Sequence, residues 1–289
     1  MRSNPAVQCS PLSSMESGAV LLREILSSVK GIVFKARRDA KIVAGDYDQG
    51  NWSRVLQEKR WLKLQNLSEY VLPEDDSKIV AKIDNRLVRI GKREYYQYRL
   101  RRLQEVLLKY AGDSDALVEL GSGYGMNVFS LVLADRWKSI HGYDISPNGI
   151  QAAREAAAHF KLNHVQFDMI DLTDSSHPSF KQLAGKTCFT YLCLEQLKYA
   201  TGKILQGLLE AKVARCVHIE PSFELLRLWA PSDLVNYLYV KKNDYQDNLL
   251  YSLRKLEREG RVRITGAERL YYAPTHRNDP TLICWEPVK

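Results

Sequence analysis

The first 112 residues carry their apolar side chains mostly at the spacing of helices. Residues 20–33 place leucine, isoleucine and valine three or four positions apart, which predicts an amphipathic helix. A second helix is expected over about 52–64 and a basic one over 92–110. Between them, β-rich runs within 78–90 flank an Asp-Asn pair that tolerates positive φ, which predicts a β-hairpin. The pattern therefore predicts a mainly helical N-terminal extension with one hairpin.

From residue 113 onward, short apolar runs alternate with amphipathic helices. Five runs are expected to be strands, at residues 116–120, 140–143, 165–167, 187–192 and 215–219. This alternation is typical of a doubly wound parallel sheet. After a helix expected at about 245–259, two β-rich runs, 262–272 and 281–285, follow each other without a helix and should pair antiparallel. We therefore expect an α/β fold over 113–289, with a seven-stranded, mostly parallel sheet and a reversed C-terminal hairpin.

Composition places the chain among ordinary globular proteins. Of its 289 residues, 45% are hydrophobic and 26% are charged. No apolar run approaches the ~20 residues that a bilayer span requires, so no membrane contact is expected. Residues 1–18 are rich in serine and proline and are expected to be a disordered tail, which leaves 19–112 as the extension. Five cysteines without a CxxC pair indicate a reduced, cytoplasmic protein with no disulfide framework and no metal site.

The positive charge is concentrated in the N-terminal part. Lys and Arg total 42 against 34 Asp and Glu, a net charge of +8. Residues 1–112 hold 21 basic and 13 acidic residues, a surplus of 8, whereas 113–289 holds 21 of each. Within 86–102, basic residues are interleaved with tyrosines, a combination that can meet phosphates and stack on bases. An amphipathic helix with a solvated basic face has the same pattern, so nucleic acid is a possible partner but not the favoured one.

A glycine-rich turn follows the first strand of the α/β region. The sequence Glu119-Leu-Gly-Ser-Gly-Tyr-Gly places an acid two residues before the first of three glycines. Glycines in such a turn let the backbone approach a ligand closely. A dinucleotide-binding G-x-G-x-x-G turn would need glycine at Met126, where none occurs. Asp144 ends the next strand, 21 residues after Gly123, where a carboxylate can bind the two hydroxyls of a ribose.

At these residues the chain resembles the class I S-adenosylmethionine-dependent methyltransferases, and the resemblance extends over about residues 100–289. The cofactor-binding residues that it implies are Glu119, Gly121, Gly123, Gly125, Asp144, Ile145 and Asp171. The acid and the glycines would hold the methionine end of S-adenosylmethionine, Asp144 the ribose, and Asp171 the adenine amine, with Asp168 as the alternative. A nicotinamide-binding Rossmann domain is the competing fold.

Two acids are expected at the rim where an acceptor would bind. Glu195 follows the fourth strand and Glu220 ends the fifth, and these strands are neighbours in such a sheet. Paired carboxylates suit a cationic acceptor, or a proton leaving a nitrogen or hydroxyl, so both are candidate catalytic residues. Either acid could instead cap a helix or pair with a basic residue. His218, between apolar neighbours, is expected to be a core histidine.

Two segments are candidate walls of the acceptor site. The long tyrosine-rich insertion 222–245 either covers the acceptor pocket or forms a helical dimer surface or extra core. The basic region before the glycine turn is a possible lid. The favoured function is methyl transfer to nitrogen or oxygen of a small polar metabolite, with a homodimer possible. The alternatives are an RNA or protein methyltransferase that docks through the basic region, and a non-catalytic cofactor-binding protein.

Overall fold

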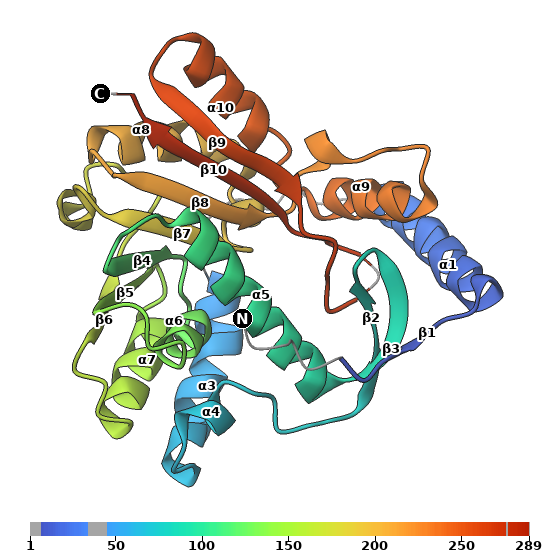
Figure 1. Cartoon of the computed structure of the whole chain (residues 1–289), viewed down its shortest axis with the longest axis horizontal. Helices are drawn as coiled ribbons and strands as arrows, with labels where there is room; N and C mark the ends of the chain where they lie inside the picture. The colour runs from blue at the N-terminus through green and yellow to red at the C-terminus, as the bar shows by residue number, and fades with distance from the viewer. Residues whose placement is uncertain (1–6, 34–44, 276, 289) are drawn as a thin grey trace.

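The centre of the molecule is a seven-stranded sheet. The computed structural model describes residues 7–33, 45–275 and 277–288 (Figure 1). The sheet has the order β6-β5-β4-β7-β8-β10-β9. Its strands are β4 (Ala116–Leu120), β5 (Ser139–Asp144), β6 (Val165–Met169), β7 (Thr187–Tyr191), β8 (Arg215–Glu220), β9 (Val262–Arg269) and β10 (Thr281–Pro287). Strands β4 to β8 pair in parallel, and β10 lies antiparallel between β8 and β9. The predicted fold class is therefore confirmed.

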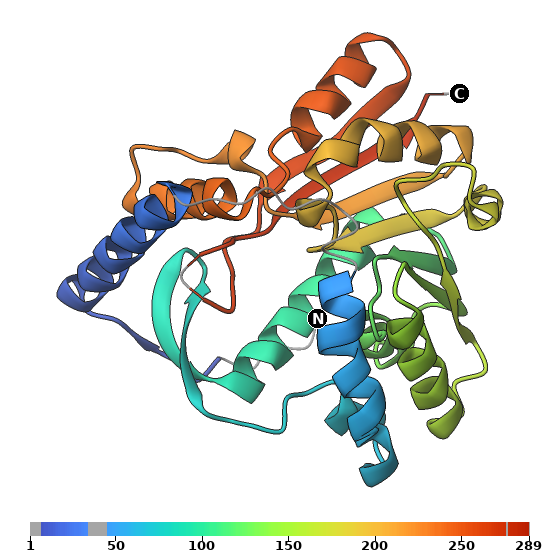
Figure 2. The same ribbon diagram turned by 180° about the vertical axis from the view of Figure 1, so that it is seen from behind.

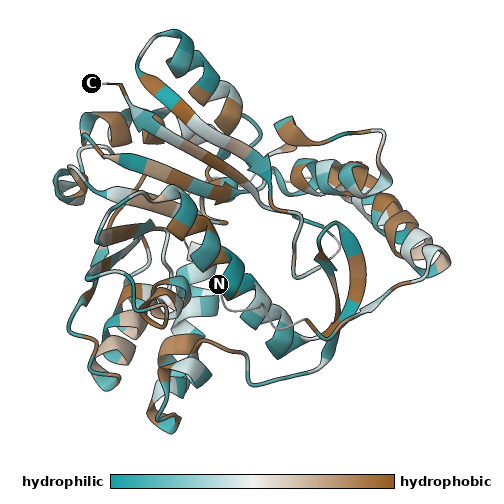
Figure 3. Cartoon of the chain, in the orientation of Figure 1, coloured by the Kyte–Doolittle hydropathy of each residue, from teal (hydrophilic) through white to brown (hydrophobic). Residues whose placement is uncertain are grey.

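Helices cover both faces of this sheet. They are α5 (Lys92–Tyr110), α6 (Met126–Val132) and α7 (Pro147–His159) on one face, and α8 (Thr201–Glu210) and α10 (Leu249–Arg258) on the other. Successive strand residues point to opposite faces, so Leu117 packs with the first group and Val118 with the second. Figure 3 shows hydrophobic residues along the strands and hydrophilic residues interspersed on the covering helices. The sheet is thus buried on both sides, as a parallel sheet requires.

Short 3₁₀ helices connect several of these elements: Pro178–Leu183, Leu194–Gln196, Lys198–Ala200 and Phe223–Leu225. Two element boundaries near the C-terminus differ from the predicted ones. Helix α10 begins at Leu249 and not near residue 245, because the Gln246 side chain accepts the N–H groups of Asn248 and Leu249 at its start. Strand β9 ends at Arg269, because Tyr271 has a positive φ of 53°.

The extension begins with strand β1 (Ser10–Pro11), which pairs with β3, and helix α1 (Ser14–Val33). The predicted disordered tail is therefore wrong for residues 10–18, whereas residues 1–6 lie outside the described residues. The physical reason is a capping box: Ser13 Oγ accepts from the Glu16 N–H at 3.2 Å, and Glu16 Oε2 accepts from the Ser13 N–H at 3.0 Å. This Ser-x-x-Glu signal is visible in the sequence.

The helix expected over 52–64 is broken at Lys59. Before the break, a π-helical turn (Asp46–Trp52) continues into α3 (Ser53–Glu58), and after it come a 3₁₀ helix (Arg60–Lys63) and α4 (Leu67–Tyr70). Lys59 adopts the left-handed conformation, with φ 44°, and ends α3. The hairpin is confirmed as β2 (Lys78–Ile83) and β3 (Arg86–Gly91). Its two turn residues both have positive φ, 48° at Asp84 and 64° at Asn85, as a tight hairpin turn favours.

The insertion after β8 forms helix α9 (Pro231–Asn243), which lies beside α1 in both views (Figures 1 and 2). The insertion therefore packs on the N-terminal extension.

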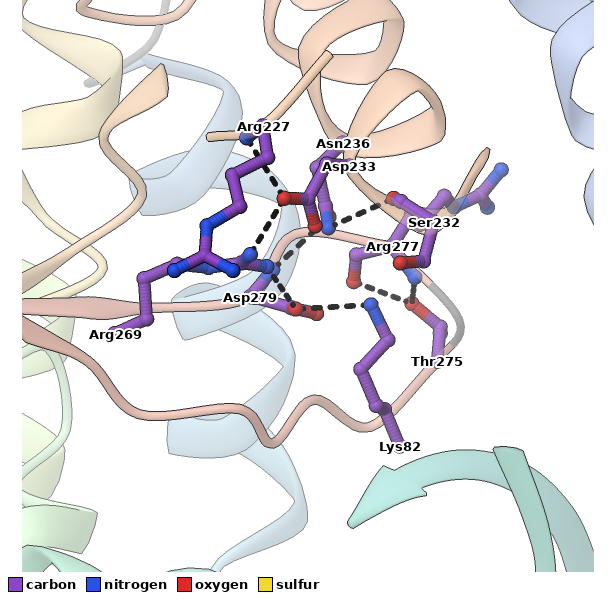
Figure 4. Close-up of polar contacts among 9 residues, drawn as sticks. All are labelled: Lys82, Arg227, Ser232, Asp233, Asn236, Arg269, Thr275, Arg277 and Asp279. Atoms are coloured by element: carbon purple, nitrogen blue, oxygen red, sulfur yellow. Dashed lines mark hydrogen bonds and ion pairs between the residues drawn. The ribbon is translucent and has the colours of Figure 1, made fainter. Parts of the chain in front are cut away.

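A buried ionic network joins the extension to the α/β domain (Figure 4). Lys82 of β2 pairs with Asp279 at 2.8 Å, with each side chain only 1% exposed. Arg269 at the end of β9 bridges Asp279, at 3.2 Å, and Asp233 of α9, at 2.6 Å. Asn236 Oδ1 accepts the Asp279 N–H at 3.2 Å. The network fixes the β9–β10 connection between the hairpin and α9.

We expect Lys82→Met to destabilise the protein by about 3–5 kcal/mol, because it leaves a buried carboxylate with fewer partners. The matched control is Lys138→Met, which breaks an exposed pair with Asp115 and should change stability little. Urea unfolding measures both free energies of unfolding. Similar losses in the two variants would contradict a structural role for the buried network.

Candidate functional site

A cavity of about 400 Å³ lies at the carboxyl ends of β4, β5 and β7. In this strand order β4 is flanked by β5 on one side and β7 on the other, and crevices of open α/β sheets form where the order reverses. One wall is the glycine turn after β4, and another comes from the N-terminal extension. None of the residues 222–245 lines this cavity.

The glycine turn is built for close packing. Gly121, Gly123 and Gly125 all have positive φ, of 82°, 53° and 88°. A Cβ on Gly121 would lie 2.1 Å from Cys193 Sγ, and a Cβ on Gly123 would lie 2.9 Å from the Trp52 ring. Both residues line the cavity, whereas Gly125 precedes α6 and packs against Phe167 behind it. The turn therefore requires glycine for two reasons: its backbone has positive φ, and Cys193 and Trp52 leave no space for a Cβ.

Asp144 lies on the cavity wall at the end of β5. Its Oδ2 accepts the Gly123 N–H at 2.7 Å, and its Oδ1 accepts the Ser146 N–H at 2.9 Å. Burial raises the pKa of Asp144, against the lowering effect of these N–H donors. Ile145, which is 40% exposed, lines the same wall. A carboxylate and an apolar surface side by side are what a ribose and a base require.

Asp171 also lines the cavity, where its Oδ1 accepts from the backbone N–H and the hydroxyl of Thr173, at 2.8 and 2.7 Å. Asp168 does not line it: its carboxylate pairs with Arg154 and, at 3.0 Å, with His141. The structure therefore favours Asp171 over Asp168 at this position.

Glu119 lies behind the glycine turn and not on the cavity wall. Its side chain is fully buried, its Oε1 accepts from Asn127 Nδ2 at 2.7 Å, and its Oε2 has no partner. Burial raises its pKa to about 8. Asn127 does line the cavity, and its Oδ1 accepts from the Arg99 guanidinium. Glu119, Asn127 and Arg99 thus form a chain of charged and polar groups that ends in the cavity.

Arg99, on α5, is a functional candidate that sequence analysis missed. It donates to Tyr191 Oη at 3.0 Å and lies 4.4 Å from the centre of that ring. Among the described residues, it is the only lysine or arginine lining the cavity. Nothing in the sequence separates it from the other basic residues of α5, because only the fold shows which one turns inward.

The segment 46–52 closes the cavity from the extension side. Asp48 Oδ1 accepts from Ser146 Oγ at 2.5 Å and from the Asn148 N–H at 3.0 Å, at the start of α7. Tyr47 Oη accepts from Gln196 Nε2 at 2.8 Å, and Trp52 packs on Tyr124 with ring centres 4.8 Å apart. Three separate contacts therefore hold this segment across the glycine turn.

Glu220, a predicted catalytic residue, is fully buried and does not line the cavity. Its carboxylate accepts the N–H groups of Cys193, Leu194 and Glu195, at 3.0, 3.1 and 3.2 Å. Burial raises its pKa to about 7. The prediction that Glu220 contacts the acceptor is not supported, because the carboxylate is occupied in holding the turn after β7.

Glu195 lies on that turn, 5% exposed, between cavity-lining Cys193 and Gln196 but not itself among the lining residues. The structure thus brings Glu195 and Glu220 together, as expected. His218 is a core residue as expected: its Nε2 accepts from Trp285 Nε1 at 2.9 Å, and burial lowers its pKa to about 3.

Within the described residues, no three histidine, cysteine or acidic side chains are arranged to hold a metal ion. In the same part of the chain, no helix has the length and apolarity that a membrane crossing requires.

Comparison with known proteins gives a fold but no close relative. No protein-family model and no curated protein matches the sequence. Among solved structures, the [4+2]-cyclase SpnF aligns with a TM-score of 0.53 and 15% identity, over 82% of this chain and 77% of that one. Magnesium protoporphyrin IX methyltransferase from Synechocystis PCC 6803, with S-adenosylhomocysteine bound, aligns with a TM-score of 0.51 and 15% identity, over 86% and 100%.

These similarities show that the chain has the class I methyltransferase fold, as the glycine turn predicted. Because a fold can host more than one reaction, the cyclase among the matches shows why the chemistry must be argued from the site.

Gly121→Ala should destabilise the protein more than Gly185→Ala. Both glycines have positive φ, 82° and 68°, so both variants incur the left-handed cost of roughly 1–2 kcal/mol. Only Gly121 adds a clash, with Cys193, because nothing lies within 4 Å of a Cβ on Gly185. Thermal unfolding of the two variants measures the difference. Equal shifts would contradict the close approach of Cys193 to the turn.

Proposed function

We propose that the protein is an S-adenosylmethionine-dependent methyltransferase that acts on nitrogen or oxygen of a small polar metabolite. The observation that carries this proposal is Asp144, held by backbone N–H groups beside the glycine turn in a cavity of this fold. The cofactor supplies a methyl group on a sulfonium, an activated leaving group that needs no strong base.

The residues around the cavity fit this cofactor from end to end. Asp144 would bind the ribose hydroxyls, Ile145 would pack on the adenine, and Asp171 would accept from its amine. At the other end, the Arg99 guanidinium suits the methionine carboxylate, and the unpartnered Glu119 Oε2 lies behind Asn127 on the same side. A guanidinium and a carboxyl group are thus available where the zwitterionic end of the cofactor would lie.

The extension is proposed to be a lid over the site. Tyr47, Trp52 and Tyr96 line the cavity from the extension side, and the Asp48 contacts fasten the segment 46–52 to α7. Excluding water strengthens the electrostatic contacts inside such a site. A cavity of about 400 Å³ that must also hold the cofactor favours a small acceptor.

Docking of RNA through the basic helix has less support. Lys92 pairs with Asp75, Arg93 donates to the Pro73 carbonyl, and Arg102 pairs with Glu105. With Arg99 turned into the cavity, much of the positive charge of α5 is engaged within the chain.

A transfer assay with labelled S-adenosylmethionine against fractions of small metabolites, RNA and protein tests the proposal. We expect label in the small-metabolite fraction. Asp144→Ala should weaken binding of S-adenosylhomocysteine at least about tenfold, because charge-assisted hydrogen bonds contribute roughly 1.5–3 kcal/mol each. The matched control, Asp168→Ala, removes a carboxylate outside the cavity and should leave the affinity unchanged. Label in RNA or protein alone, or equal effects of the two substitutions, would refute the assignment.

A further inference from the structure

Next to the cavity lies a group of residues that we call the acid–tyrosine cluster: Glu195, Asn278, Tyr47, Tyr239 and Tyr245. It shares a wall with the cavity, because Gln196 and Tyr47 line the cavity and are joined by a hydrogen bond of 2.8 Å. Glu195 is the residue directly before Gln196. The cluster therefore lies where an acceptor could extend beyond the cofactor.

Two acceptor atoms of the cluster lack a donor. Glu195 Oε2 accepts from Asn278 Nδ2 at 3.2 Å, but Oε1 receives no hydrogen bond from the described residues. Asn278 Oδ1 is buried and has no partner either. Because Nδ2 is engaged by the carboxylate, the amide oxygen is the atom of Asn278 that is left to accept from a donor. A buried acceptor without a donor, such as Asn278 Oδ1, is costly, so the arrangement suits a ligand that brings an N–H group.

The carboxylates at the cluster also lack a cationic partner in the part of the chain that the structure describes. Glu195 lies beside Glu220, and no lysine or arginine of the described chain forms an ion pair with either carboxylate. Arg277, which stacks 5.0 Å from the centre of the Tyr239 ring, pairs instead with Glu24. Burial and the neighbouring Glu220 raise the pKa of Glu195 well above its usual range. A cation bound at Glu195 would relieve this repulsion.

Two tyrosine rings of the cluster lie near the Glu195 carboxylate. Tyr239 and Tyr245 meet edge to face, with ring centres 5.8 Å apart. The chain at Tyr245 is fixed against Glu195, because the next residue, Gln246, donates its N–H to the Glu195 carbonyl at 2.6 Å. Burial, and after it the Glu195 carboxylate, raises the pKa of both tyrosines. Rings around a carboxylate are a favourable environment for an organic cation.

We propose that the acid–tyrosine cluster binds the ammonium group of the acceptor, with Glu195 and Asn278 accepting its N–H groups. This inference rests on the proposed methyltransferase function and narrows its substrate class to amines. The buried ionic network of Figure 4 contributes indirectly, because it fixes the β9–β10 connection that carries Asn278. Glu195 is thereby assigned to acceptor binding, and Glu220 to positioning the turn on which Glu195 lies.

Calorimetry on the protein saturated with S-adenosylhomocysteine tests this. The probes are primary ammonium ions, from methylammonium to benzylammonium, and the alcohols of the same skeletons. We expect at least one ammonium ion to bind about tenfold or more tighter than its alcohol, a difference of ~1.4 kcal/mol. Glu195→Gln, which keeps the shape and the contact with Asn278, should abolish this preference. Asn278→Ala should reduce it.

The control variant is Glu259→Gln, at an exposed position after α10, which should bind as the wild type does. Unchanged melting temperature and S-adenosylhomocysteine affinity in Glu195→Gln would exclude misfolding as the cause. If no ammonium ion is preferred, or if the preference survives in Glu195→Gln, the subsite is refuted while the proposed function stands. Failure of the wild-type protein to bind S-adenosylhomocysteine would instead refute the proposed function.

Discussion

The hydrogen bond from the Gly123 N–H to the Asp144 carboxylate joins the two strand ends on which the cavity is built. It connects the turn after β4 to the end of β5, and the same carboxylate accepts the Ser146 N–H at the start of α7. Only a backbone with positive φ brings that N–H into position, which is why glycine stands there. Two side chains pack against this turn. Cys193 comes from the loop after β7, and Trp52 comes from the extension.

The N-terminal extension contributes residues to the cavity wall. Its segment 46–52 is fastened to α7 through Asp48, and its helix α5 brings Arg99 to the cavity. On the other side, Lys82 of the hairpin holds the β9–β10 connection through Asp279. Removing charges of this kind from water is expensive, and only well-placed partners offset that cost. The walls on both sides of the cavity therefore depend on contacts between segments far apart in sequence.

The sequence pattern predicted more of the cavity-lining residues at the ends of β4 and β5 than elsewhere in the cavity wall. A local rule places five of these residues, because each lies in a turn or at a strand end. They are Gly121, Gly123, Asp144, Ile145 and Asp171. The roles of Glu220 and Arg99 could not be predicted in this way. Whether Glu220 faces a ligand or three backbone N–H groups depends on how the loop after β7 folds back. Which arginine of α5 turns inward depends on how the extension packs.

The predicted helix boundaries were wrong where one or two residues determine the local backbone. Lys59, in the left-handed conformation, splits a stretch whose apolar spacing indicated one helix. The Ser13–Glu16 capping box orders a segment whose composition indicated disorder. The fold class was nevertheless predictable, because strand–helix alternation over 113–289 leaves few topologies open.

The cavity is proposed to bind S-adenosylmethionine through the carboxyl ends of β4 and β5. Calorimetry of the wild-type protein with S-adenosylhomocysteine and, separately, with NAD tests it most directly. One S-adenosylhomocysteine should bind per chain, and NAD should not bind. Binding of NAD without binding of S-adenosylhomocysteine would contradict the proposed cofactor.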